Sequence, residues 1–268
     1  MSALLKDLNG FLENRFLILV LVKRDFTSRY KNSILYLLWP FIHPFLTLFT
    51  LWFVFTVGLR AGKPVNGIPF ILWLTAGLIP WYFFSESISK GVIAIKESSY
   101  IVMNMPFRLE ILPIVKVLSS LTIHSFFLLV MLVMLSLFHP SNFFILWPQL
   151  IYYIFCMIIL TMSINLITSS IFVFIRDVSE IVKIGLNFAF WLTPIIWNDQ
   201  ALSPTLKFLF RLNPVGYIVR GYRDTLLYGK VFWADLSQMV SFWAITLVLM
   251  LFSIYIFKKL RPHFADML

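Results

Sequence analysis

The sequence predicts an all-α membrane protein with six transmembrane helices, an N-terminal interfacial amphipathic helix and an extracellular re-entrant helical hairpin before the last span. Hydrophobic residues make up 60% of the 268 residues, only 13% are charged, and the mean hydropathy is +0.89. Soluble domains carry about 25% charged residues, so this chain holds too much apolar surface for a water-soluble fold. With about 20 residues needed per span, residues 1–268 form one transmembrane domain with room for about six spans.

The formal net charge of +10 does not indicate nucleic-acid binding. The basic residues stand in short clusters between apolar runs, which is typical of membrane topology signals. The single cysteine, Cys156, lies inside an apolar run, so we expect no disulfide framework and no thiol metal site. No cleavable signal peptide is expected in residues 1–12, which are polar and mixed in character.

Residues 9–32 predict the interfacial helix, because the apolar part is too short to span and basic residues flank or interrupt it. The six-span bundle is expected over residues 33–257. Its spans are predicted at about 33–58, 68–92, 111–138, 147–175, 181–197 and 236–257.

The second span carries Pro69, Gly77 and Pro80 within an apolar run and ends in four aromatic residues. Proline inside a helix removes a backbone hydrogen bond, which membranes tolerate only where protein or water satisfies the released group. This pattern predicts a broken helix that lines a cavity.

The orientation follows from the distribution of the 22 Lys and Arg residues. Most of them fall in the connections on the side of the two termini, which predicts that both termini are cytoplasmic. Five basic residues between positions 198 and 235 are an exception on the outer side. Long connections obey the charge rule less strictly, so the predicted orientation stands.

The long outer segment contains the sequence LSPTLKFLFRLNPVGYIVRGYRDTLLYGK, which Asn213 and Pro214 divide. Two short helices around this turn predict a re-entrant hairpin over residues 202–227. The alternative is an extracellular loop at the membrane surface. The hairpin is favoured by the spacing of the apolar residues Leu206, Phe208, Leu209, Phe210 and Leu212.

The connection KESSYIVMNMPFRLEILP is cytoplasmic in this topology. The serine pair Ser98 and Ser99 can start a short helix that ends before Pro106. Such a helix would expose Tyr100, Ile101 and Met103 to a soluble partner, whereas the alternative is an ordinary loop.

The chain shows no energy source of its own. The stretch from Gly58 to Pro64 resembles a phosphate-binding loop, but it has three residues between its glycines and proline in place of Ser or Thr. We therefore expect no cofactor in this chain, and no catalytic set or metal site suggests an enzyme. Only Glu86, His43 and His124 are candidates for proton coupling within the spans. For Glu86 we prefer pairing with a nearby basic residue, and for the two histidines we prefer packing between helices.

Several stretches together resemble the permeases of ABC exporters for bacterial surface polysaccharides. They are YLLWPFIHPF, WFVFTVGLRAGKPVNGIPFILWLTAGLIPWYFF, NMPFRLEILP, FIRDVSEI and LNPVGYIVRGYRDTLLYG, and with the N-terminal segment they cover most of the chain. Within that group the chain looks most like the wall teichoic acid permease TagG/TarG, mainly through GLRAGKPVNGIPF. Permeases for O-antigen or capsular polysaccharide are the alternative.

The resemblance implies a homodimer in the bacterial plasma membrane, with two soluble ABC ATPase subunits that bind ATP and Mg. Its substrate would be wall teichoic acid or a similar polysaccharide on undecaprenyl pyrophosphate, moved from the cytoplasmic to the outer leaflet. A self-contained secondary transporter is the alternative from another class, and it would need no partner ATPase.

The resemblance also assigns roles by motif. Contact with the ATPase falls to a coupling helix at residues 96–107 and to residues 174–178, with the candidates Lys96, Glu97, Tyr100, Ile101, Met103, Phe107, Arg176 and Asp177. The re-entrant gate falls to residues 202–227, with the candidates Arg211, Asn213, Pro214, Arg220, Tyr222 and Arg223. Whether its three arginines attract polymer phosphates or anchor to lipid headgroups stays open, with anchoring preferred.

A polymer rich in hydroxyl groups cannot cross hydrocarbon unaided, because each unsatisfied polar group costs several kcal/mol. We therefore expect a water-compatible pathway whose aromatic side chains pack against sugar rings, although packing against lipid or protein is the simpler role for each residue alone. The candidates for this pathway are Trp39, Trp81, Tyr82, Phe83 and Trp191. Lys23, Arg24 and Arg29 of the interfacial helix are the candidates that meet the lipid headgroup where it enters.

Overall fold

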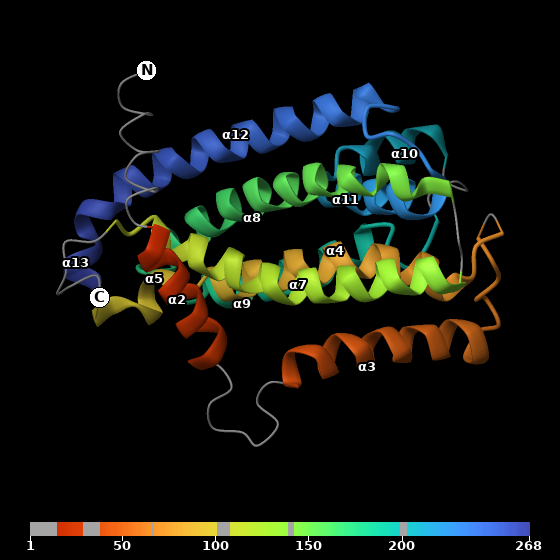
Figure 1. Ribbon diagram of the computed structural model, residues 1–268. Coiled ribbons are helices and arrows are strands. Elements are labelled where there is room, and N and C mark those ends of the chain that lie inside the picture. Colours follow the sequence, from red (N-terminus) through yellow and green to blue (C-terminus); the bar gives the residue numbers. More distant parts are fainter. Residues whose placement is uncertain (1–14, 29–37, 66, 101–107, 139–141, 199–202) are drawn as a thin grey trace.

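Helices make up the structure throughout the parts of the chain that it describes, which are residues 15–28, 38–65, 67–100, 108–138, 142–198 and 203–268. In this computed structural model, the only β pairing among those residues is an isolated bridge between Val65 and Ile68. The longest helices lie side by side, and α2, α5 and α13 gather at one end of the bundle while α10 and α11 lie at the other (Figure 1).

The helices follow the chain in a simple order. Their bounds are α2 Arg15–Ser28, α3 Trp39–Phe53, α4 Phe70–Gly91, α5 Ala94–Glu97, α7 Ile111–Phe138, α8 Leu150–Phe172, α9 Val178–Leu192, α10 Pro204–Arg211, α11 Pro214–Arg223, α12 Leu236–Leu260 and α13 Phe264–Met267. Short π-helical segments extend α3 through Gly58 and α11 through Tyr228, and 3-10 helical segments precede α8 and follow α12.

Four helical stretches in the described part of the chain are long and apolar enough to cross a membrane. They are Trp39–Gly58, Ile111–Leu137, Phe144–Phe172 and Leu236–His263, which correspond to the first, third, fourth and sixth predicted spans. The other two predicted spans do not meet these criteria. Helix α9 has only 15 residues, and the last turns of α4 carry polar residues including Glu86 and Lys90.

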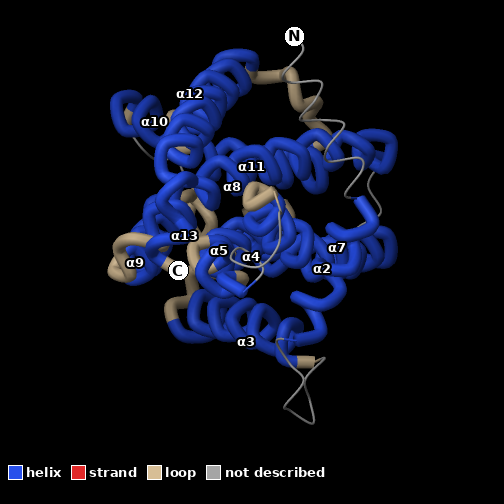
Figure 2. Tube along the Cα trace, turned by 90° about the vertical axis from the view of Figure 1, so that its left-hand side faces the viewer, coloured by secondary structure: helices blue, strands red, loops and turns tan. Residues whose placement is uncertain are grey.

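Helix α4 lies at the centre of the molecule, in contact with α3, α7, α8, α9 and α11 (Figure 2). The prediction that this helix is broken is wrong, because α4 is continuous from Phe70 to Gly91 with Pro80 inside it. Neighbouring helices bury most of its residues, and this packing holds the helix together despite the missing backbone donor. Gly77 serves close packing, since a Cβ atom there would lie 2.5 Å from Nη2 of Arg223.

Arg223 joins three parts of the chain that are distant in sequence. Its side chain is buried, and it donates hydrogen bonds to the carbonyls of Trp73 at 3.2 Å and of Pro194 and Ile195 at 2.6 Å each. Its guanidinium carbon also lies 3.5 Å from the centre of the Trp73 ring. The expectation that Arg223 anchors to lipid headgroups or attracts phosphates is therefore wrong, because backbone carbonyls inside the protein already hold this group.

The turn at Asn213 and Pro214 separates α10 from α11, as the sequence predicts. The Asn213 side chain accepts hydrogen bonds from the backbone N–H groups of Val215 and Gly216, and proline stands in the first turn, where its missing N–H costs nothing. Most of α11 is buried against α4, α8 and α12, which excludes a loop at the surface for this half of the segment. That the pair forms a re-entrant hairpin in the outer leaflet stays a prediction.

Replacing Arg223 tests how far the fold depends on it. We expect Arg223→Leu to lower the stability of the purified protein by about 3 kcal/mol or more, because three backbone carbonyls lose a charged donor. Thermal unfolding in detergent would measure this. The matched control is Arg211→Leu, which changes an exposed arginine and should leave the melting temperature close to that of the wild type.

A second substitution makes the test specific. Gly77→Ala should destabilise the wild type, because its new methyl group would meet the Arg223 guanidinium, and it should cost much less in the Arg223→Leu background. Equal costs in the two backgrounds would contradict the proposed contact.

Candidate functional site

A groove of about 670 Å³ lies between α3, α4 and α9. Its walls combine aromatic, hydroxyl and charged side chains. They are Trp39, Pro40, His43, Pro44 and Thr47 of α3, Trp81, Tyr82, Ser85, Glu86, Ser89 and Lys90 of α4, and Lys183, Leu186, Asn187 and Phe190 of α9. The groove is therefore built from three helices that the chain brings together from distant segments.

Helix α4 gives one continuous face to this groove. Its lining residues recur at spacings of three to four, which places them above one another on a helix. Tyr82 donates a hydrogen bond from its hydroxyl to the carbonyl of Pro44 at 3.3 Å, and the Trp81 ring centre lies 5.5 Å from that of Phe190. These contacts join α4 to α3 on one side and to α9 on the other.

The charged residues of the groove lie toward one end of it. Glu86 pairs with Lys90 one turn later on α4, and Lys183 pairs with Glu180 at 2.6 Å on α9. Lys90 is near the end of α4 and Lys183 near the start of α9, so both belong to the end of the bundle that holds α5 and α13. The groove thus combines an aromatic wall with cations at the end that is predicted to be cytoplasmic.

The structure brings together three of the five residues predicted for the pathway, since Trp39, Trp81 and Tyr82 all line the groove. Phe83 does not, because it lies one position further round α4 and is buried with its ring 5.3 Å from His124 of α7. Trp191 is exposed beyond the groove, and its carbonyl accepts a hydrogen bond from the Trp197 indole at 3.0 Å. The groove therefore includes the predicted residues of one face of α4 and not the one on the next face, and their role in a pathway stays a prediction.

The residues predicted to meet the lipid headgroup lie elsewhere. Lys23 and Arg24 are exposed on α2, which packs against α7 and contributes nothing to the groove lining, and Arg29 lies outside the described residues. The cations of the groove are Lys90 and Lys183, which the sequence reading did not single out. The preferred interpretation of Glu86 as a paired residue is confirmed, because Lys90 pairs with it at the spacing of a helical ion pair.

The predicted ATPase-contact residues divide into exposed and inward-facing groups. Tyr100 is 73% exposed, and Arg176 and Asp177 are exposed at the connection between α8 and α9. Lys96 donates a hydrogen bond to the carbonyl of Met267 at 3.4 Å. Ile101, Met103 and Phe107 lie outside the described residues.

These connections stand on an apolar cluster at the same end of the molecule. It consists of Ala94, Ile95, Leu109, Leu112, Val173, Phe257 and Phe264, which come from α5, the start of α7, the end of α8, α12 and α13. The connections that expose Tyr100, Arg176 and Asp177 are therefore held in place by a buried apolar cluster.

Glu97 faces inward, to an ion-pair cluster that the sequence reading missed. The Lys116 ammonium lies 2.6 Å from Oδ1 of Asp25 and 2.5 Å from Oε2 of Glu97, and its side chain is only 9% exposed. This Lys116 cluster (Asp25, Glu97 and Lys116) joins α2 and α5 to α7. A signal was present, because a single charge within the apolar run of α7 is rare unless it is paired.

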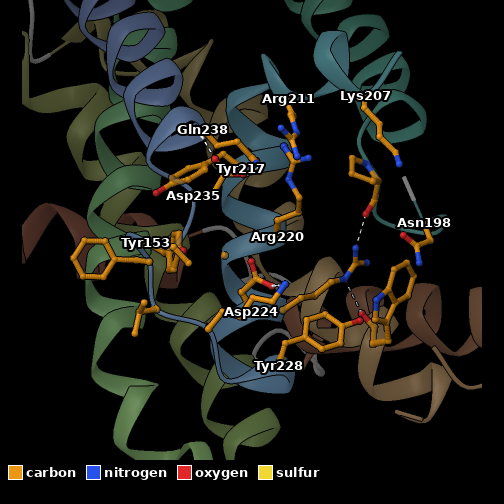
Figure 3. A pocket seen from close by; sticks show the side chains of 18 of the residues that line it. Tyr153, Asn198, Lys207, Arg211, Tyr217, Arg220, Asp224, Tyr228, Asp235 and Gln238 are labelled. Carbon is orange, nitrogen blue, oxygen red and sulfur yellow. Dashed lines mark hydrogen bonds and ion pairs between the residues drawn. The ribbon is translucent and has the colours of Figure 1, made fainter. Parts of the chain in front are cut away.

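The predicted gate residues have several different roles. Asn213 caps α11 and also donates to the Thr193 hydroxyl at 2.9 Å, while Pro214 opens the helix. Tyr222 is buried and its hydroxyl lies 2.9 Å from Nε2 of His124, which fits the packing interpretation of that histidine. Arg211 and Arg220 line a second pocket at the α10 end of the molecule (Figure 3), and Arg223 lines it too although backbone carbonyls hold its guanidinium group.

The chain is similar in sequence to known transport proteins. The family described as ABC-2 type transporter matches residues 17–227. The chain is also similar to three proteins named O-antigen export system permease protein RfbA. One from Myxococcus xanthus is 27% identical, and two from Klebsiella pneumoniae are 26% and 24% identical. Each alignment covers 94% of this chain and 95% of the relative.

The Lys116 cluster predicts a contrast between two lysines. Lys116→Met should lower stability by about 3–5 kcal/mol, because it removes the cation that lies 2.6 Å from the largely buried carboxylate of Asp25. Lys183→Met removes an exposed pair and should change stability by less than about 1 kcal/mol. Thermal unfolding of both variants would measure the difference, and similar melting temperatures would show that the Lys116 cluster does not stabilise the fold.

Proposed function

The chain belongs to the ABC-2 type transporter family, and we propose that it exports a lipid-linked surface polysaccharide of the O-antigen type. As the membrane subunit of such an exporter it is not itself catalytic, and the family implies a partner ABC ATPase. The three relatives named as O-antigen export permeases align over nearly the whole chain. Wall teichoic acid, which the sequence reading preferred, rests on one stretch between α3 and α4 and is the less supported substrate.

The observation that carries this proposal is the groove between α3, α4 and α9. Its aromatic side chains, Trp39, Trp81 and Tyr82, offer flat faces that pack against sugar rings. Its hydroxyl and amide groups give a glycan the partners that hydrocarbon lacks. Lys90 and Lys183 stand where the pyrophosphate of an undecaprenyl-linked glycan would enter from the cytoplasm, since phosphate groups favour cationic partners.

We further propose that a second copy of the chain closes this groove. Helix α3 is almost entirely unburied, and α9 exposes Ile184, Phe188 and Trp191. A second copy packed against α3 and α9 would cover these side chains and convert the open groove into a pathway enclosed by protein.

This arrangement also accounts for six spans. Helix α4 is surrounded by other helices, and α9 would be covered by the second copy. Neither would then face lipid along its whole length. Both could cross the bilayer without the length and hydropathy of an isolated span.

The ATPase is proposed to dock at the end that carries α5 and α13. Tyr100, Arg176 and Asp177 are exposed there, on either side of the packed cluster that ends α8 and α12. The coupling segment at residues 96–107 would seat in the ATPase, and ATP and Mg would bind only to that partner.

A deletion strain tests the function directly. Without the gene, lipid-linked polymer should accumulate inside the cell and surface polymer should disappear, and the wild-type gene should restore both. The composition of the accumulated polymer identifies the substrate class, because a glycan without polyol phosphate supports the O-antigen type and a polyol phosphate polymer supports teichoic acid. Normal surface polymer in the deletion strain would contradict an export function.

The cations of the groove give a sharper prediction. Lys90→Gln combined with Lys183→Gln should reduce export about tenfold, which corresponds to about 1.4 kcal/mol and lies at the low end for a charge-assisted hydrogen bond. The matched control is Lys258→Gln combined with Lys259→Gln, which removes two exposed charges at the same end outside the groove. Export that is equally low in both variants would mean that general charge, and not the groove, is responsible.

Docking of the ATPase makes a separate prediction. Tyr100→Asp should reduce co-purification of the ATPase, because an exposed aromatic side chain that anchors an interface is replaced by a charge. Trp233→Asp, which changes an exposed aromatic residue in the connection before α12 at the opposite end of the molecule, is the control and should leave the complex intact. The isolated chain should hydrolyse no ATP, and normal assembly of the Tyr100 variant would place the interface elsewhere.

A further inference from the structure

A second pocket of about 540 Å³ opens at the other end of the molecule, away from the groove (Figure 3). The α10–α11 pair, the connection after α11 and the first turn of α12 surround it. Its described lining residues are Trp73, Tyr153, Pro194, Trp197, Asn198, Lys207, Arg211, Tyr217, Arg220, Gly221, Arg223, Asp224, Tyr228, Lys230, Val231, Phe232, Ala234, Asp235 and Gln238. None of these residues takes part in the groove between α3, α4 and α9.

Positive charge predominates in this pocket. Five basic and two acidic side chains stand among its described lining residues. Asp235 caps α12 by accepting hydrogen bonds from the backbone N–H of Gln238 at 3.2 Å and from its side-chain amide at 2.5 Å. Asp224 lies 3.6 Å from the ammonium of Lys230. The charges of Arg220 and Arg223 also act on the Asp224 carboxylate. With five basic and two acidic side chains, the described lining of the pocket still carries an excess of three positive charges.

Two of the basic residues, Arg211 and Arg220, enter the pocket from different helices. Arg211 reaches in from the end of α10 and Arg220 from α11, and their side chains extend toward one another (Figure 3). Like charges that line the same pocket repel, and they repel more strongly where water is partly excluded. An anion between them would reverse the sign of this interaction, and guanidinium groups bind phosphate oxygens through paired hydrogen bonds.

Aromatic rings stand beside these cations. Trp73, Tyr153, Trp197, Tyr217 and Tyr228 all line the pocket. Flat rings next to guanidinium groups suit a ligand with a sugar ring or glycerol backbone attached to a charged group. The pocket therefore combines the two kinds of side chain that an organic phosphate requires.

We propose that this pocket binds a phosphate ester at the outer face of the membrane. The inference rests on the proposed orientation, which places the α10 end outside. The ligand chemistry is shared by two sources, the phosphate of the glycan lipid as it arrives in the outer leaflet and the headgroup of an anionic phospholipid. In either case Arg211 and Arg220 hold the phosphate, and the aromatic rings hold the group attached to it.

The test measures binding to the purified full-length chain in nanodiscs of phosphatidylcholine. The probe is N-acetylglucosamine 1-phosphate, with uncharged N-acetylglucosamine as the comparison and calorimetry as the measurement. We expect saturable binding of the phosphate ester that weakens with added salt, and no binding of the uncharged sugar at the same concentration. Equal binding of both sugars, or of neither, would overturn the proposal.

Substitutions locate the site. Arg211→Gln combined with Arg220→Gln should weaken binding of the probe at least tenfold. Arg211→Gln alone should also weaken it measurably, and this variant should fold normally because Arg211 is exposed. The control, Arg60→Gln combined with Lys63→Gln, removes two exposed charges from the loop between α3 and α4, outside the pocket, and should bind as the wild type does. Unchanged affinity in the Arg211 and Arg220 variants, with a normal melting temperature, would also overturn the proposal.

The lipid composition distinguishes the two sources. If nanodiscs that contain phosphatidylglycerol abolish probe binding, the phospholipid headgroup is the occupant. If they do not, the sugar phosphate is. The measurement needs neither the ATPase nor transport, so a failure here leaves the export function standing. Loss of export in the groove variants with intact probe binding would instead point to the groove.

Discussion

The arrangement of this molecule depends on the burial of one charged side chain, that of Arg223. A buried guanidinium costs several kcal/mol unless hydrogen bonds replace its water. Here the carbonyls of Trp73, Pro194 and Ile195 accept those bonds, and the Trp73 ring covers one face of the group. The carbonyls at 194 and 195 follow the end of α9, where no further helical turn supplies donors. The same hydrogen bonds therefore replace the water around the Arg223 guanidinium group and provide donors for backbone carbonyls that lie outside a regular helix.

With α11 held in this position, different side chains pack against each face of α4. Its small residues face the polar side chains that approach it, since a Cβ atom at Gly77 would meet Arg223 and one at Gly91 would meet Asn165 of α8. Phe83 faces α7, where it packs against His124. The face that carries Trp81 and Tyr82 is the one that borders the groove. One helix thus forms a wall of the groove and holds the helices that form the second pocket.

Local sequence signals predicted much of this fold. The limits of α7 follow from a long, mainly apolar run with one charged residue, Lys116, and the division between α10 and α11 follows from the chemistry of Asn213 and Pro214. The continuity of α4 could not be predicted, because the contacts that support the helix around Pro80 come from α7, α8 and α11. Arg223 looked like a surface charge because its partners stand 28 to 150 residues away in the chain. Phe83 lies outside the groove because a helix turns about 100° per residue, so the face that carries Trp81 and Tyr82 does not extend to a third consecutive aromatic residue.

The two ends of the molecule are joined by polar contacts through its core. Glu97 contacts Lys116 at the start of α7, and His124 lies two turns further along the same helix. His124 contacts Tyr222 of α11, next to Arg223. If a partner docks at residues 96–100 as proposed, α7 is the helix that links its binding site to α11, through Lys116 at one point and His124 at the other. Such a path transmits a change only if its contacts have a second stable arrangement. The buried contact between His124 and Tyr222 is the link most able to have one, because it is a single hydrogen bond between two helices.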